Sequence, residues 1–332
     1  MGAAQPEPHG NALWIPELPK RAASLTPSAC RTTALTDTSP SPCNHADSAT
    51  PRSVTADIVR FHGNVRSELR DRVAIEEPLE IRIDFVASGV RVTRSLSITM
   101  RTPGHDAELA AGFLMTEGIV HSAREIETIR PCGQETGAHD GSNVVKVRMN
   151  DNATIAWPSV ERNFYATSSC GVCGKASLEA LEVPGLCPIP RDGFRFSADV
   201  IRMLPDRLRA QQSTFEETGG LHAAALFNPA GELLSIREDV GRHNAVDKLI
   251  GAQFIEGHTP LHGNLLFLSG RISFELAQKA LAAGIPMVAA VGAPSSLAIE
   301  LAKRFDITLI GFLRGDRFNI YSGAWRLVGD TA

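Results

Sequence analysis

Three short apolar runs, separated by helical stretches, constrain the fold of this chain more than any other feature of its sequence. The runs are Leu265–Leu268, Met287–Val291 and Ile307–Phe312, and the helical stretches between them are Ser273–Ala283 and Ser295–Arg304. Strands that are apolar at nearly every position are buried on both faces, which is typical of largely parallel sheets covered by helices. The sequence therefore predicts a three-layer α/β domain with helices on both faces of its sheet.

The segment ahead of these runs predicts how the α/β domain opens. Ser197–Gln212 is typical of a helix with a serine cap. Leu221–Phe227 and Glu232–Ile236 are strand-like and flank an Asn-Pro-Ala-Gly turn, which predicts a hairpin. A short helix is expected at Asn244–Gly251. We therefore assign residues 197–332 to this domain.

A smaller α+β domain is predicted over residues 56–160. Leu79–Val86 alternates apolar and polar residues, as a half-buried strand does, and Val90–Met100 continues the pattern after a turn. Ala107–Glu117 is predicted to be a helix with Asp106 as its N-cap. The other features expected here are a helix stop at Gly118 and strands at Val144–Met149 and Thr154–Trp157.

Residues 1–55 are rich in Pro, Ser, Thr and Ala and contain little apolar sequence. Such a segment buries too little apolar surface to offset the entropy of ordering it. We therefore predict a disordered leader, with order beginning near Val54, in which Cys30 and Cys43 have no role.

Composition excludes several classes of protein. A net charge of −4 over 332 residues gives no argument for nucleic-acid binding. No apolar run approaches the roughly 20 residues that cross a bilayer, and the N-terminus lacks the pattern of a secretory signal. We therefore expect a cytoplasmic protein. Six cysteines are too few for a disulfide scaffold in a chain of this length, so a closely spaced pair indicates metal binding or catalysis.

That pair is Cys170 and Cys173, within residues 161–196, which are predicted to form a long irregular loop. A Cys-x-x-Cys turn suits half of a zinc site, a redox dithiol or a sulfur-carrying nucleophile. No second ligand pair lies nearby, and the pair is not at a strand-to-helix junction. Lys175 would enrich the thiolate. These observations favour a sulfur carrier, while an incomplete zinc site or two inert thiols stay open.

Three predicted strands of the α/β domain end in segments suited to an anionic ligand. Ligands of open α/β sheets bind at the carboxyl ends of strands, where helix N-termini offer free N–H groups. The residues that we expect at such a site are Ser269, Gly270, Arg271, Phe312, Leu313, Arg314, Gly315, Asp316 and Arg317. A further Gly-Ala-Pro-Ser-Ser segment begins at Gly292. Any one of these three strand-end segments is more commonly a helix cap or turn, but together the segments favour a phosphorylated or nucleotide-like ligand. No Walker or Gly-x-Gly-x-x-Gly motif is present.

Two histidines flank the predicted hairpin of this domain. His222 lies at the start of its first strand, and His243 follows Glu238, Asp239 and Arg242 after its second strand. The hairpin would bring both to one end of the sheet, which predicts that they contact the ligand. The alternative is a histidine in the core and a solvated charge run.

Several motifs, in order from about residue 60 to the end, resemble those of the formate dehydrogenase accessory sulfurtransferases, the FdhD/NarQ family. The segments on which this resemblance rests are Arg101–Gly104, Glu108–Leu114, Cys170–Gly174, Gly219–Ala224, Glu238–Lys248, Ser269–Arg271 and Gly311–Gly315. The leader lies outside this resemblance.

The resemblance implies a sulfurtransferase that accepts persulfide sulfur from a cysteine desulfurase. The sulfur passes to the molybdenum bis(molybdopterin guanine dinucleotide) cofactor before that cofactor enters formate dehydrogenase. The persulfide position matches Cys170, with Cys173 as its partner, and the cofactor-contacting stretch matches Phe312–Arg317. The family also implies a homodimer and a fold similar to cytidine deaminases.

Two other functions stay open at this point. A non-catalytic chaperone would bind the molybdenum cofactor and use its cysteines only for structure or for zinc. A deaminase-like hydrolase is disfavoured, because zinc deaminases need His-x-Glu followed by Pro-Cys-x-x-Cys. Here His222 is followed by Ala223-Ala224, and the cysteine pair precedes that strand.

Overall fold

The computed structural model describes residues 50–132, 143–153, 155, 185–191 and 194–329. The chain divides into two units, Met1–Cys43 and Asn44–Ala332, and all the described residues lie in the second. The predicted leader up to residue 49 and the Cys-x-x-Cys segment lie outside the described residues.

A six-stranded sheet forms the centre of the α/β part, in the order β13-β12-β11-β10-β8-β9. Its strands are β8 (His222–Phe227), β9 (Leu233–Asp239), β10 (Leu265–Leu268), β11 (Met287–Ala290), β12 (Thr308–Arg314) and β13 (Arg317–Ser322). β10, β11 and β12 are parallel, whereas β8 and β9 form the predicted hairpin and β13 pairs antiparallel with β12. The apolar runs are thus confirmed as neighbouring buried strands.

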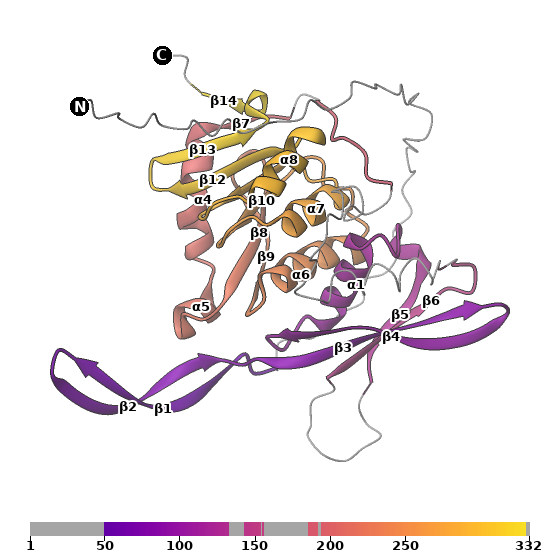
Figure 1. The fold of residues 1–332 in the computed structure, drawn as a ribbon, viewed down its shortest axis with the longest axis horizontal. Coiled ribbons are helices and arrows are strands. Elements are labelled where there is room, and N and C mark those ends of the chain that lie inside the picture. The colour runs from indigo at the N-terminus through magenta and orange to yellow at the C-terminus, as the bar shows by residue number, and fades with distance from the viewer. Residues whose placement is uncertain (1–49, 133–142, 154, 156–184, 192–193, 330–332) are drawn as a thin grey trace, which may run out of the picture. The chain divides into compact units, whose positions relative to one another are not determined.

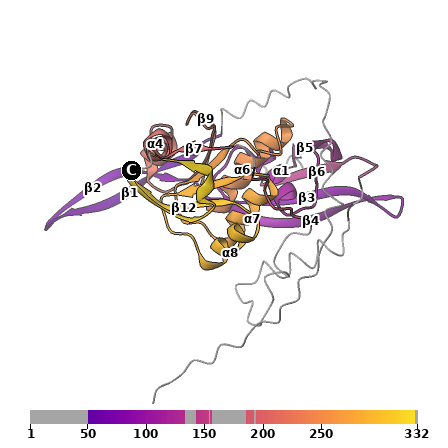
Figure 2. The ribbon, with the colours of Figure 1, turned by 90° about the horizontal axis from the view of Figure 1, so that it is seen from above.

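Helices cover both faces of this sheet, which confirms the predicted three layers. On one face, alternate strand residues such as Leu226, Leu266 and Val288 pack against three helices. These are α6 (Arg242–Ile255), α7 (Phe274–Ala282) and α8 (Ser296–Arg304). The intervening strand residues face α4 (Ala198–Arg209), which begins at the predicted cap Ser197. Figure 2 shows α4 on the opposite side of the sheet from α7 and α8.

A second sheet of four strands, in the order β4-β3-β6-β5, carries the N-terminal part of the fold (Figure 1). Its strands are β3 (Glu77–Ala87), β4 (Val90–Arg101), β5 (Ile126–Pro131) and β6 (Val144–Met149). The predicted hairpin is β3–β4, and the predicted strand at Thr154–Trp157 falls largely outside the described residues. Helix α1 (Asp106–Thr116) packs Leu109 and Leu114 on this sheet. Its N-cap is His105, at φ 60°, so the prediction of Asp106 was wrong by one residue.

Helices α1 and α6 cross closely and join the two sheets. A Cβ added at Gly112 of α1 would overlap the carbonyl oxygen of Asp247, and one added at Gly251 of α6 would overlap that of Glu108. Phe254 of α6 also enters the core beneath α1. Only glycine fits at both positions, because backbone meets backbone there.

The remaining elements are short, apart from one long ribbon. They are β1 (Ser53–His62), β2 (Val65–Ala74), η1 (Ala123–Glu125), β7 (Phe196–Ser197), α5 (Ser213–Thr218), η2 (Ala324–Arg326) and β14 (Leu327–Val328). Among the described strands, β1 and β2 pair only with each other, antiparallel, across the Gly63-Asn64 turn. Among the described residues, no helix has the length and apolar character needed to cross a membrane.

Candidate functional site

The carboxyl ends of β10, β11 and β12 lie at one edge of the six-stranded sheet, here called the carboxyl edge. β8 runs in the opposite direction, so it begins at this edge, where His222 pairs with Asp239 at the end of β9. The predicted residues brought together here are His222, His243, Ser269, Gly270, Arg271, Phe312, Leu313, Arg314, Gly315, Asp316 and Arg317. The sheet topology therefore gathers at one edge all the cofactor-site residues expected from the sequence.

A pocket of about 440 Å³ opens at the carboxyl edge on the α4 side of the sheet. Its walls combine apolar side chains with a few polar groups, namely Pro205, Leu208, Arg209, Gln212, Phe215, Gly219, Gly220, Leu221, His222, Phe267, Ser269 and Val291. Gln212 is buried, and its Nε2 atom has no hydrogen-bond partner among the described residues. An unsatisfied buried amide is costly, so this group suits a ligand that carries an acceptor.

His222 and Ser269 are adjacent on the wall of this pocket. Burial lowers the pKa of His222, and the charges of Arg242 and His243 lower it further, against an opposing effect of Asp239. The imidazole is therefore neutral near pH 7. Ser269 Oγ accepts a hydrogen bond from the backbone N–H of Ala223 at 2.8 Å, which leaves its own proton to donate.

The N-termini of α6 and α7 bring His243 to the same edge of the sheet. Its Nε2 atom lies 3.4 Å from Ser273 Oγ and 3.9 Å from a carboxylate oxygen of Glu275. Arg271, between β10 and α7, is exposed. The free N–H groups of the two helix starts and the basic side chains beside them favour an anion.

The exit of β12 has an unusual backbone at Phe312. This residue is 42% exposed and adopts φ 55°, a strained conformation for an aromatic residue, while its N–H donates to the Gly292 carbonyl at 3.0 Å. Leu313 points into the core, whereas Arg314 and Arg317 are exposed and pair across the turn. Backbone strain of this kind is concentrated at functional sites, although Leu313 can offer a ligand only its main chain.

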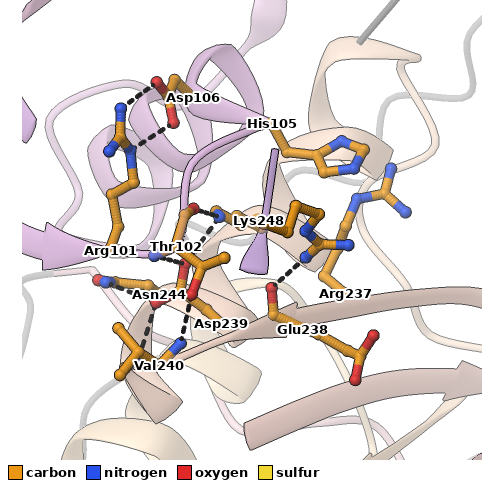
Figure 3. Close-up of polar contacts among 12 residues, drawn as sticks. Arg101, Thr102, His105, Asp106, Arg237, Glu238, Asp239, Val240, Asn244 and Lys248 are labelled. Atoms are coloured by element: carbon orange, nitrogen blue, oxygen red, sulfur yellow. Dashed lines mark hydrogen bonds and ion pairs between the residues drawn. The ribbon is translucent and has the colours of Figure 1, made fainter. Parts of the chain in front are cut away.

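A buried polar network holds the turn between β9 and α6 in place (Figure 3). Lys248 Nζ lies 2.7 Å from Asp239 Oδ2 and donates to the Thr102 carbonyl at 2.7 Å, and both charged side chains are 0% exposed. Thr102 N donates to the same carboxylate at 3.1 Å, and Val240 N donates to Thr102 Oγ1 at 3.2 Å. Asn244 Nδ2 donates to Asp239 Oδ1 at 3.1 Å. The network fixes the turn that carries Arg242 and His243.

Sequence reasoning noticed Asp239 but missed Lys248 and Thr102 as its partners. A signal for Lys248 is present, because it is a lone cation within a stretch of α6 that is buried on all sides. A cation in such surroundings requires a buried counter-charge. For Gln212 no comparable signal exists, since its burial depends on how α4 and α5 meet.

A second ion cluster lies at the start of α1, beside that network. Burial alone would raise the pKa of Glu108, but hydrogen bonds from Arg237 and His105 outweigh this effect and lower it to about 2. Arg237 Nη2 donates to Glu108 Oε1 at 2.7 Å, and His105 Nδ1 lies 3.1 Å from Oε2. Arg101 donates two hydrogen bonds of 2.9 Å to the carboxylate of Asp106 (Figure 3). These contacts tie the Arg-Thr-Pro-Gly turn to β9.

The predicted catalytic pair, Cys170 and Cys173, lies outside the described residues. Within the described ranges, no group of three or more His, Cys, Asp or Glu side chains is arranged to hold a metal ion.

Curated relatives match most of this chain. The sulfur carrier protein FdhD of Streptomyces coelicolor is 49% identical over 274 residues, covering 81% of this chain and 94% of that protein. Its counterpart in Mycobacterium tuberculosis is 49% identical over 262 residues, covering 77% and 92%. The archaeal protein of the same name from Saccharolobus solfataricus is 42% identical over 271 residues, covering 82% and 96%.

A solved structure shares the fold. A protein from Desulfotalea psychrophila, assigned as a formate dehydrogenase accessory protein, superimposes with a TM-score of 0.62 at 24% identity. The match covers 84% of this chain and 100% of that chain. The sequence profile described as the FdhD/NarQ family matches residues 74–328, which include the whole carboxyl edge. With this match and relatives near 49% identity over most of its length, the chain belongs to the FdhD/NarQ family.

Proposed function

We propose that this protein is a sulfur carrier that supplies sulfur for formate dehydrogenase. The observation that carries the proposal is the family membership, because the relatives that match most of the chain are named sulfur carrier proteins. In the proposal, the sulfur arrives from a cysteine desulfurase and leaves to the molybdenum bis(molybdopterin guanine dinucleotide) cofactor, which is the substrate. The carrier is cytoplasmic, as are its proposed donor and acceptor.

The first step of the proposed reaction is a thiol exchange at Cys170. Its thiolate attacks the outer sulfur of the persulfide on the donor, Cys170 gains that sulfur, and the thiolate of the donor leaves. A thiolate is the attacking species in such exchange, and Lys175 favours it.

Release of the sulfur requires two electrons, because the carried sulfur leaves as sulfide. Cys173 supplies them by attacking the inner sulfur of the Cys170 persulfide. The products are a Cys170–Cys173 disulfide and sulfide, which the molybdenum centre takes up. The disulfide is then reduced by a cellular thiol before the next cycle.

The carboxyl edge is the proposed site for the nucleotide parts of the cofactor. Its exposed arginines and its helix N-termini suit a pyrophosphate, and the pocket with His222, Ser269 and Gln212 offers polar groups beside apolar walls for a base. These features support an anionic nucleotide ligand independently of the family name.

Maturation of formate dehydrogenase tests the proposal. Cells that depend on this chain for formate dehydrogenase activity are supplied with the full chain, with Cys170→Ala or with Cys187→Ala. The proposal predicts that C170A abolishes activity and that C187A, which alters an exposed cysteine outside the pair, leaves it unchanged. Full activity with C170A would favour the alternative, a chaperone that only binds the cofactor.

A further inference from the structure

The side chain of Gln212 is a buried polar group that the fold itself does not use. Only 5% of the residue is exposed, and its Nε2 atom has no hydrogen-bond partner among the described residues. A buried donor without a partner is costly, and nearly all buried polar groups of folded proteins are paired. Such a group therefore indicates a partner from outside the chain.

The local structure explains why the amide of Gln212 is left over. Gln212 stands at the N-cap position of α5, where a side chain commonly accepts from the first backbone N–H groups of the helix, but it makes no such bond. The buried carboxylate of Glu238 on β9 takes this place. It accepts from the backbone N–H groups of Thr214 at 3.2 Å and Phe215 at 2.9 Å. The start of α5 is thus capped by another residue.

The backbone of Gln212 is fixed beside the pocket of about 440 Å³ at the carboxyl edge, and the residue forms part of the pocket wall. Its N–H donates to the carbonyl of Arg209 at 3.2 Å, and its carbonyl accepts from the N–H of Glu216 at 2.9 Å. The terminal torsion of a glutamine is soft, so the amide can turn its N–H toward a ligand. Gln212 therefore offers a donor from a rigid position.

The other polar side chains of the wall share this character. Ser269 keeps a proton to donate, and His222 is neutral near pH 7. The guanidinium of Arg209 lies 4.5 Å from the centre of the Phe215 ring. No aspartate or glutamate is among the described residues that line the pocket. A wall that offers donors and no carboxylate suits a ligand edge made of acceptors.

Apolar side chains form the rest of the wall, among them Leu208, Phe215 and Phe267. Apolar and aromatic walls with a few polar groups are typical of small-molecule sites, whose volumes are about 300–1,000 Å³. Aromatic side chains also favour the face or the edge of a planar ring. The pocket therefore suits a flat heterocycle that carries a carbonyl group.

We propose that Gln212 is a specificity-determining residue, which donates from Nε2 to the carbonyl oxygen of a 2-amino-4-oxopyrimidine ring in this pocket. Guanine and the pterin of the proposed cofactor share this ring. Adenine carries an amino group in place of the carbonyl, so it sets a donor against the donor of Gln212. The inference rests on the proposed function, because it takes that cofactor as the ligand.

Replacement of Gln212 by Met tests this role, because methionine has a similar volume and no donor. Gln211→Met, at the exposed neighbouring position, is the matched control. Titration calorimetry of the full chain with GDP, ADP and neopterin distinguishes the two sources of the ring. If the pocket holds guanine, the wild type should bind GDP about tenfold or more tighter than ADP. Q212M should then lose this preference by weakening GDP and not ADP, while Q211M should match the wild type.

Neopterin is the probe for the second source. If the pocket holds the pterin, Q212M should weaken neopterin by about tenfold or more and leave GDP unchanged, because a buried partner is lost only for the pterin. Either pattern supports the proposal and identifies which part of the cofactor occupies the pocket.

Urea unfolding separates recognition from a structural role. Q212M removes an unpaired buried donor, so its unfolding midpoint should equal or exceed that of the wild type. A lower midpoint together with weaker binding of every probe would overturn the proposal. So would GDP and neopterin affinities that Q212M leaves unchanged, and this result would leave the proposed function intact. A wild-type chain that binds neither GDP nor neopterin would contradict both the proposed cofactor site and this inference.

Discussion

At the scale of single residues, the site depends on charges that have no access to water. Asp239 and Lys248 are both fully buried, and their partners Thr102 and Asn244 come from elements far apart in the sequence. Burial lowers the pKa of Lys248, while Asp239 opposes that effect. Neither charge is tolerable alone in such surroundings, because an ion that loses its partner keeps the desolvation penalty.

Replacement of Lys248 by Met should therefore destabilise the fold strongly. The carboxylate of Asp239 would lose its counter-charge, which costs about 3–5 kcal/mol of unfolding free energy for a buried pair. Arg148→Met is the matched control, because Arg148 and Glu127 are 46% and 44% exposed and 3.0 Å apart. The control should lose less than about 1 kcal/mol. Urea unfolding measures both, and equal losses would contradict this account.

The lowered pKa of Glu108 predicts a dependence of stability on pH. Its folded-state value of about 2 lies below the usual value of 4.5, so the stabilisation is present above pH 4.5 and is lost as pH falls toward 2. Glu108→Gln removes the titrating group. Between pH 4.5 and 2, the unfolding free energy of the wild type should fall more steeply with pH than that of the variant. The difference in slope corresponds to the uptake of at most one proton on unfolding. Parallel slopes in urea unfolding would contradict the assignment.

At the scale of elements, the crossing of α1 and α6 carries the strictest packing requirement. Gly112 and Gly251 bring the two backbones together, and the Asp239–Lys248 network lies beside this crossing. A displacement of either helix would therefore alter the turn that carries His243.

Gly112→Ala tests this crossing. The added Cβ would meet the backbone of Asp247, which cannot rotate away, so the helices must separate. Overpacking of this kind costs about 1–3 kcal/mol, seen as a lower melting temperature. The control is Gly263→Ala, where nothing lies within 4 Å of the added atom, and its melting temperature should match that of the wild type. A G112A variant with the melting temperature of the wild type would contradict the close contact of the two backbones at this crossing.

Elements with a continuous apolar signal could be predicted from the sequence, and elements without one could not. β10 was predicted to the residue because each of its side chains is buried. The ribbon was missed, since β1 and β2 alternate charges with exposed apolar residues and have no covered face. Helix α6 extends beyond its predicted range of Asn244–Gly251, because it is buried nearly all round and lacks a helical period.

At the scale of the whole molecule, the sheet topology places motifs that are far apart in the sequence at one edge of the sheet. His222, Ser269 and Phe312 are separated by long stretches of sequence, yet each stands at a strand end on the carboxyl edge. The sequence predicted this gathering because parallel strands end at the same side. It did not predict the buried network behind the edge, since that depends on which turn of the second sheet meets β9 (Figure 3).

The most direct test of the sulfur-carrier function is a persulfide measurement on the purified full chain. The protein is incubated with a cysteine desulfurase and cysteine, alkylated, digested and mapped by mass spectrometry, with zinc content determined in parallel. One additional sulfur is expected on the Cys170 peptide, absent in Cys170→Ala and retained in Cys187→Ala. A wild-type chain without added sulfur but with stoichiometric zinc, or a label unchanged in C170A, would contradict it.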